Sequence, residues 1–434
     1  MSLTIMMKLS GRRELLIQTI ISFFCRALAA IAALITSLVI GRQLGAEGAG
    51  LYFLAFSIVS FVSAFSRLGL DNTIVRFCGA ALPERNWGII RTTVYKAILI
   101  SSLVSFSLAI VLYYSADLLA ESLFQKSELG AVLKLISPGI VGLSVLTLIS
   151  MALQGTRRIP ASILIQTIVV NLVLAIGLYI YSVSSPESAA LAYSITTVLT
   201  VIFGCYLFFS NLERGSQVVS WQALFKSCMP LWIVVIMQQT VQWSGQFIAG
   251  SFVSTEEVAQ LAVAQRTALL VSFVLMAVNM VVAPRYAAMF KQAKMAELED
   301  MAITSTRIMI FLSIPVVTIM VVIPDYIMGL FGEGFSGGAS LLQILAVSQF
   351  VNVMTGSVAY LLTMSGHEKE LRNTALISGP VAIVLGLVLT PIYGVTGAAI
   401  ATAIAISTQN IMAMWLVNKR LGFNTMAIWK KTNC

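Results

Sequence analysis

Twelve apolar stretches, each long enough for a membrane-spanning helix, run through this chain. A helix needs about 20 apolar residues to cross the hydrocarbon core of a bilayer, and only short loops remain between these stretches. Of the 434 residues, 58% are hydrophobic and 10% are charged, whereas a soluble domain has roughly 25% charged residues. The sequence therefore predicts an all-α polytopic membrane protein with about 12 transmembrane helices. The expected spans are residues 18–40, 48–70, 92–114, 131–153, 161–182, 188–210, 228–252, 258–283, 303–323, 339–364, 373–391 and 396–417.

The basic residues are distributed unevenly over the loops. With the N-terminus placed in the cytoplasm, only Arg42, Lys126 and Lys134 of the 27 lysines and arginines are external, while Arg26 and Arg266 lie within spans. Short loops rich in Lys and Arg stay cytoplasmic, so this distribution predicts that both termini are cytoplasmic. The net charge of +9 then reflects topology and contact with anionic membrane lipids, and it does not indicate a nucleic acid partner.

The cytoplasmic segment 284–301 has apolar and charged residues in a helical pattern. Met289, Phe290 and Leu298 stand against Lys291 and Lys294. This pattern predicts a short amphipathic helix that lies on the membrane surface.

The chain resembles itself when it is shifted by 209 residues. This shift aligns Val75-Arg76-Phe77 with Pro284-Arg285-Tyr286, and it aligns residues 189–192 with residues 398–401. Each match is weak alone, but all fall at equivalent topological positions. We therefore expect two six-helix halves, residues 1–212 and 213–434, related by a parallel internal repeat. Transporters with such a repeat hold the substrate path between the halves and alternate access to it.

The residues that a membrane enzyme or a metal site needs are scarce. The five cysteines are scattered without a CxxC spacing, and the one histidine, His367, lies in a polar turn. Acid–base or metal chemistry would need paired carboxylates, histidines or a ligand cluster, and a channel would need a filter loop or charged rings. The sequence favours a transporter without a cofactor or metal over these classes, and it leaves open a structural protein of an export complex.

Two arginines lie inside expected spans. Arg26 is about eight residues from the cytoplasmic end of its span and Arg266 about eight from the external end of its span, so each lies ~12 Å deep. Either side chain could extend to the interface, or each could form an internal ion pair, although no acid inside the membrane is evident as a partner. We favour a shared cavity in which both arginines bind an anion. The guanidinium group suits phosphate particularly well.

The seventh expected span carries a polar stripe. Gln238, Gln242 and Gln246 recur every four residues, and Gln265, beside Arg266, would extend the same surface. These glutamines are expected either to hold helices together or to line the substrate cavity, and the sequence favours neither role.

The repeat also aligns two arginines at the cytoplasmic ends of equivalent spans. Arg76 and Arg285 are expected either to flank the cytoplasmic mouth of the substrate path or to act only as positive anchors of the topology.

Several glycine-rich motifs resemble the polysaccharide transporters of the multidrug/oligosaccharidyl-lipid/polysaccharide flippase superfamily. The resemblance covers nearly the whole chain. The motifs are Gly41-Arg42-Gln43-Leu44-Gly45-Ala46-Glu47-Gly48-Ala49-Gly50-Leu51-Tyr52, Arg67-Leu68-Gly69-Leu70-Asp71, Val75-Arg76-Phe77, Ala152-Leu153-Gln154-Gly155, and the segment from Pro391 to Thr402.

This resemblance implies a flippase that moves an undecaprenyl-diphosphate-linked oligosaccharide from the inner to the outer leaflet of the cytoplasmic membrane, in surface-polysaccharide or O-antigen assembly. It implies a cationic cavity with basic residues in the first and eighth spans, where Arg26 and Arg266 lie. It also implies a polysaccharide polymerase and other assembly proteins as partners. The chain departs from many members in span 7, where Gln242-Trp243-Ser244-Gly245-Gln246 stands in place of an acidic residue. The alternative is a cation-coupled multidrug antiporter of the same fold, which would need a buried acid.

Overall fold

The computed structural model describes residues 3–210, 212, 213, 215 and 217–429, and these residues form helices and turns without any strand. The first half of the chain contains α1 (Leu3–Ser66), α2 (Leu70–Ala81), α3 (Trp87–Leu118), η1 (Leu119–Leu123), α4 (Glu128–Ile136), α5 (Gly139–Gly155), α6 (Ile159–Ile163), η2 (Leu164–Val169), α7 (Val170–Ile180) and α8 (Pro186–Phe209). The second half contains α9 (Trp221–Phe252), α10 (Thr255–Lys291), α11 (Met295–Val322), α12 (Pro324–Gly329), η3 (Ser336–Gly338), α13 (Ala339–Met354), α14 (Val358–Met364) and α15 (Glu368–Leu421).

These helices provide the twelve predicted spans. Nine helical segments of the described residues are long and apolar enough to cross a membrane, and α4 with α5, bent by 41°, form a tenth span. Two of the nine segments contain an interruption and therefore cross twice. α1 is broken at Gly45 (φ 68°) and α15 at Gly394 (φ 60°). A positive φ is accessible to glycine because it has no Cβ, so the glycines allow each chain reversal. The prediction of about 12 transmembrane helices is confirmed.

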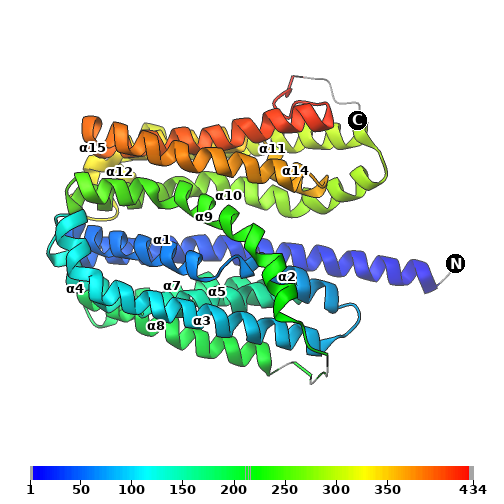
Figure 1. Cartoon of the computed structure of the whole chain (residues 1–434). Helices are drawn as coiled ribbons and strands as arrows, with labels where there is room; N and C mark the ends of the chain where they lie inside the picture. Colours follow the sequence, from blue (N-terminus) through cyan, green and yellow to red (C-terminus); the bar gives the residue numbers. More distant parts are fainter. Residues whose placement is uncertain (1–2, 211, 214, 216, 430–434) are drawn as a thin grey trace.

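The breaks between spans recur at the predicted interval of 209 residues. Gly45 corresponds to Ser254, the N-cap of α10, and Ser185, the N-cap of α8, corresponds to Gly394. Each half thus crosses an even number of times. Accordingly, α1 begins and α15 ends at the same end of the bundle (Figure 1). The division at residue 212 itself remains a prediction.

The helix α9 connects the two halves. Its first turns pack on the first half, where the indole Nε1 of Trp232 donates a hydrogen bond of 3.0 Å to the carbonyl of Phe65. Its later turns pack on α15, where Gly245 lies against Thr402. Figure 1 shows α9 passing obliquely from the side of α2 toward the group formed by α10 to α15.

One of the glycine-rich motifs forms the turn between α1 and α2. The Nε of Arg67 contacts both carboxylate oxygens of Asp71, at 2.8 and 3.1 Å, and its Nη1 donates to Ser63. Both side chains of this ion pair are nearly buried. Gly69 adopts a positive φ, and a Cβ there would lie 2.5 Å from the carbonyl oxygen of Cys228 in α9. The motif therefore fixes the turn and lets α9 approach it closely.

At the opposite end of the bundle, which the charge distribution predicts to be external, the two halves are in tight contact. A Cβ on Gly50 would lie 1.8 Å from the carbonyl oxygen of Thr255, so only glycine permits this approach of α1 to α10. Arg42 donates from Nε to the carbonyl of Leu330 at 2.9 Å. These contacts hold the two halves together at this end.

The prediction of a surface helix over residues 284–301 is wrong. α10 continues to Lys291, a short turn follows, and α11 begins at Met295. Tyr286 and Leu298 belong to one buried cluster. The charged and apolar pattern therefore belongs to the ends of two spans that pack on each other.

Candidate functional site

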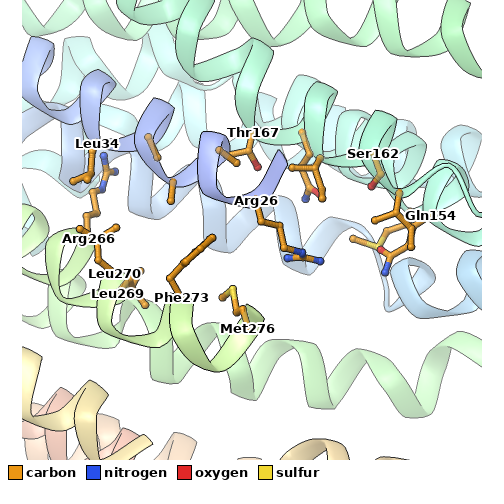
Figure 2. A pocket seen from close by; sticks show the side chains of 17 residues that line it. Arg26, Leu34, Gln154, Ser162, Thr167, Arg266, Leu269, Leu270, Phe273 and Met276 are labelled. Atoms are coloured by element: carbon orange, nitrogen blue, oxygen red, sulfur yellow. The ribbon is translucent and has the colours of Figure 1, made fainter. Parts of the chain in front are cut away.

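A cavity of about 460 Å³ lies between helices of the first half and α10 of the second half. Its volume lies within the range of roughly 300–1,000 Å³ that is usual for small-ligand sites. The lining residues come from α1 (Arg26, Ala29, Ala30, Ala33, Leu34), α5 (Met151, Gln154), α6 and η2 (Ile159, Ser162, Ile163, Gln166, Thr167) and α10 (Arg266, Leu269, Leu270, Phe273, Met276). Both intramembrane arginines line this one cavity (Figure 2).

Arg266 is held on aromatic rings in the neighbouring part of α1. Its Cζ lies 4.2 Å from the ring centroid of Phe53 and 5.2 Å from that of Phe56. Its Nη1 donates a hydrogen bond of 3.1 Å to Ser37. A cation over an aromatic face is stabilised by ~2 kcal/mol when it is removed from water. The rings thus compensate part of the cost of keeping this charge inside the membrane without a carboxylate.

Arg26 is less constrained. Its Nε is buried and has no hydrogen-bond partner among the described residues. In Figure 2 its guanidinium group points into the space between Met276 and Gln154, whereas Arg266 lies near Leu34 at the other end of the view. A donor in this position is available to an incoming acceptor.

Neither arginine takes part in a salt bridge within the described part of the chain. The four ion pairs found there join Arg67 to Asp71, Lys134 to Asp117, Lys294 to Glu297, and Arg420 to Glu370. No acidic residue lines the cavity. The cavity is thus cationic and lacks an internal counter-charge among its lining residues, an arrangement that suits an anion.

The first half contributes a polar wall that sequence reasoning did not identify. Gln154, Ser162, Gln166 and Thr167 face the cavity. Ser150 joins α5 to this wall by a hydrogen bond of 2.8 Å to Oε1 of Gln166 and one of 2.7 Å to the hydroxyl of Ser162. A sequence pattern could have revealed this wall. In each of two adjacent apolar spans a serine is followed four residues later by a glutamine, as Ser150 with Gln154 and Ser162 with Gln166.

The glutamines of the predicted stripe lie outside the lining of this cavity. Nε2 of Gln246 donates to Oε1 of Gln265 at 3.2 Å, and Nε2 of Gln265 donates to the carbonyl of Gln242 at 2.8 Å. Gln238 is exposed. The structure therefore places Gln246, Gln265 and Gln242 in hydrogen bonds that join α9 to α10.

The structure does not bring the two aligned arginines together. Arg76 lines a cavity of about 460 Å³ beside α9, together with Lys226. Arg285 lines a separate cavity of about 860 Å³ between α1, α10 and α11, which also contains Glu297 and Asp300. Their role at a cytoplasmic mouth stays a prediction.

Twelve spans in two repeated halves, with a cavity between the halves, define a multi-pass membrane transporter. Residues 15–290 match the family described as "Polysaccharide biosynthesis protein", and residues 230–392 match the family described as MatE. The chain belongs to the polysaccharide biosynthesis protein family.

Several named proteins are similar to this chain. The probable low-salt glycan biosynthesis flippase Agl15 of Haloferax volcanii is 22% identical over 390 residues, which are 86% of this chain and 76% of that protein. The structure is similar to an inward-facing multidrug resistance MATE family transporter (TM-score 0.76, 14% identity, 93% of this chain and 98% of that chain). It is also similar to the lipid II flippase MurJ in an inward closed conformation (TM-score 0.75, 15% identity, 92% and 87%). At these identities the structural similarity establishes the fold.

Proposed function

We propose that the protein is a flippase that moves a polyprenyl-diphosphate-linked oligosaccharide from the inner to the outer leaflet by alternating access. The family match and the similarity to a probable glycan biosynthesis flippase support this class of substrate. The product would feed surface-polysaccharide or O-antigen assembly. Transport of this kind changes no covalent bond of the substrate, so the proposal includes no catalytic residue and no cofactor.

The observation that carries the proposal is the pair Arg26 and Arg266 in one cavity between the halves, with no acid among the lining residues. A diphosphate that crosses the low-dielectric centre of a membrane needs compensating positive charge, because an unpaired buried ion costs several kcal/mol even after relaxation. Two guanidinium groups can supply this charge through hydrogen bonds to the phosphate oxygens.

The same observation argues against a multidrug antiporter, to which the MATE structures would also point. Organic cations would be repelled by two arginines that no carboxylate balances. Cation coupling would also need an acid, and span 7 has glutamines at 242 and 246, of which Gln246 donates a hydrogen bond to Gln265. We therefore prefer the flippase.

We further propose the cytoplasmic membrane as the location, with both termini in the cytoplasm. The uneven distribution of basic residues supports this orientation. Membrane lipids surround the protein in this proposal, and a polysaccharide polymerase and other assembly proteins act on the exported substrate.

The test is complementation of a host that lacks this protein. Arg26→Ala and Arg266→Ala should each abolish display of the surface polysaccharide and cause the lipid-linked oligosaccharide to accumulate. The lysine variants should keep part of the activity, because lysine retains the charge and loses the bidentate geometry.

Membrane abundance of every variant is measured alongside, so that a folding defect is recognised. Gln222→Ala, at an exposed position near the start of α9, serves as the control and should be as active as the wild type. Normal display by both alanine variants at wild-type abundance would refute the proposal.

A further inference from the structure

The cavity that Arg26 and Arg266 line has two chemically different sides. On the side of α10, Leu269, Leu270, Phe273 and Met276 present apolar groups. The opposite side, formed by α5, α6 and η2, presents the amides of Gln154 and Gln166 and the hydroxyl of Ser162. The arginines account for binding of a phosphate, but a phosphate alone would leave this uncharged polar wall without a ligand.

The polar wall is built on irregular backbone. η2, residues Leu164–Val169, is a π-helix, a form that is rare and often occurs at functional sites. Side chains support this segment: Nδ2 of Asn171 donates to the carbonyl of Thr167 at 2.7 Å, and Thr36 of α1 donates to the carbonyl of Asn171 at 2.9 Å. The segment is therefore held in place although its helical hydrogen bonds are irregular.

The amide of Gln166 is oriented by one partner only. Ser150 donates a hydrogen bond of 2.8 Å to the amide oxygen of Gln166. The amide nitrogen of Gln166 has no hydrogen bond within the described part of the chain, and the side chain lines the cavity. The side chain of Gln154 faces the same cavity, where no described residue forms a hydrogen bond with it. Two amides that face a membrane-buried cavity in this way provide donors and acceptors for a polar ligand without charge.

We infer that the wall formed by Gln154, Ser162 and Gln166 is a subsite for the uncharged sugar that is attached to the diphosphate. A sugar ring has hydroxyl groups at its edge and C–H groups on its faces. Its hydroxyls would pair with the amides of the first half, and a C–H face would lie against Phe273 of the second half. A bare polyprenyl diphosphate offers only acceptor oxygens, which the arginines bind, and it has no hydroxyl groups that could pair with both the donors and the acceptors of this wall. The inference rests on the proposed function, since the arginines hold the diphosphate next to this subsite.

The test measures binding of two probes to the purified protein in nanodiscs. One probe is the lipid-linked oligosaccharide that accumulates in a host lacking the protein, and the other is a polyprenyl diphosphate without sugar. The wild type should bind the glycosylated probe at least about tenfold more tightly, since sites built to hydrogen-bond hydroxyl groups discriminate strongly against ligands that lack them. Gln154→Leu and Gln166→Leu should bring this ratio close to one and leave the affinity for the sugar-free probe unchanged.

An unchanged affinity for the sugar-free probe also shows that the leucine variants are folded. The control Gln222→Leu, at the exposed position on α9, should keep the wild-type ratio of the two affinities. Equal binding of the two probes by the wild type would overturn the inference, as would a full ratio in both leucine variants. The proposed function has a separate readout: Arg26→Ala with Arg266→Ala should weaken binding of the sugar-free probe. If this double variant binds the sugar-free probe as tightly as the wild type, the arginines do not bind the diphosphate, whatever the ratio of the two affinities is.

Discussion

The ammonium group of Lys126 donates a hydrogen bond of 2.7 Å to the carbonyl of Gly250, across the boundary between the two halves. A second hydrogen bond, of 2.8 Å, reaches the carbonyl of Val253, so the lysine caps the C-terminal end of α9. Burial lowers the pKa of Lys126, and the nearby carboxylate of Glu257 partly offsets this shift.

Such hydrogen bonds give basic residues a structural role at the end that is predicted to be external. Of the three exceptions to the positive-inside distribution, Lys126 and Arg42 each bond carbonyl groups of the other half. Lys134 instead pairs with Asp117 at 2.5 Å, within the first half. Two of the three thus join the two halves at the end that is predicted to be external.

Lys126→Met should favour the externally open state. The substitution removes the donor and leaves the carbonyls of Gly250 and Val253 without their partner, at a cost of about 1–3 kcal/mol. That corresponds to a shift of roughly 5- to 150-fold in the equilibrium between the two states. The measurement is the rate at which an impermeant thiol reagent, added outside, labels a cysteine introduced at Ala33 in the cavity, with the five native cysteines replaced.

Lys134→Met is the matched control for this prediction. It removes an external lysine whose partner lies in the same half, so the labelling rate should stay at the wild-type value. An unchanged rate for Lys126→Met as well would show that this lysine does not stabilise the closed end.

The predicted orientation can be tested with cysteines at exposed positions of opposite ends. Ser184 and Ser336 are exposed at the end predicted to be external, and Glu368 is exposed at the other end. An impermeant label added to intact cells should react at the first two positions and should reach position 368 only after permeabilisation. Labelling of position 368 in intact cells would reverse the assignment of the two sides.

Neutralising Arg76 should impair transport more than neutralising Arg285. Arg76 shares its cavity with Lys226, whereas Arg285 shares its cavity with Glu297 and Asp300. The field around Arg76 is thus the one that would attract an anionic head group to the cytoplasmic side. Arg76→Gln should increase the accumulated lipid-linked oligosaccharide severalfold, and Arg285→Gln should change it little. If neither substitution alters accumulation while the topology is preserved, both residues serve only as anchors.

The number of spans and the places where the chain reverses could be predicted from the sequence, because the length of an apolar stretch is a local property. Gly45 and Gly394 fall between expected spans, and there the chain reverses. Segment 284–301 was misread because the same pattern suits a surface helix and the packed ends of two spans. Only the structure distinguishes these two arrangements, because it shows Tyr286 and Leu298 in one buried cluster.

The candidate site could be predicted only in part. The depth of Arg26 and Arg266 follows from their positions in the spans, and both do line one cavity. The rings that hold Arg266, Phe53 and Phe56, come from a span more than 200 residues away. Likewise, Gln154 and Gln166 meet in the cavity only because their helices are rotated toward it, and no local pattern specifies this rotation. The hydrogen bond from Gln246 to Gln265 likewise joins two helices that no local pattern brings together, and the role of the whole stripe stays a prediction.

Translocation in reconstituted vesicles is the direct test of whether Arg26 and Arg266 carry the diphosphate across the membrane. The lipid-linked oligosaccharide from a host that lacks the protein is incorporated into the vesicles, and its arrival in the outer leaflet is followed by oxidation with impermeant periodate. With equal amounts of reconstituted protein, we expect Arg26→Ala combined with Arg266→Ala to be at least about a hundredfold slower than the wild type. The reason is that an uncompensated buried diphosphate costs several kcal/mol and each ~1.4 kcal/mol is a factor of ten in rate. Equal rates for the double variant and the wild type would show that the arginines do not carry the diphosphate, because neither arginine could then be substituting for the other.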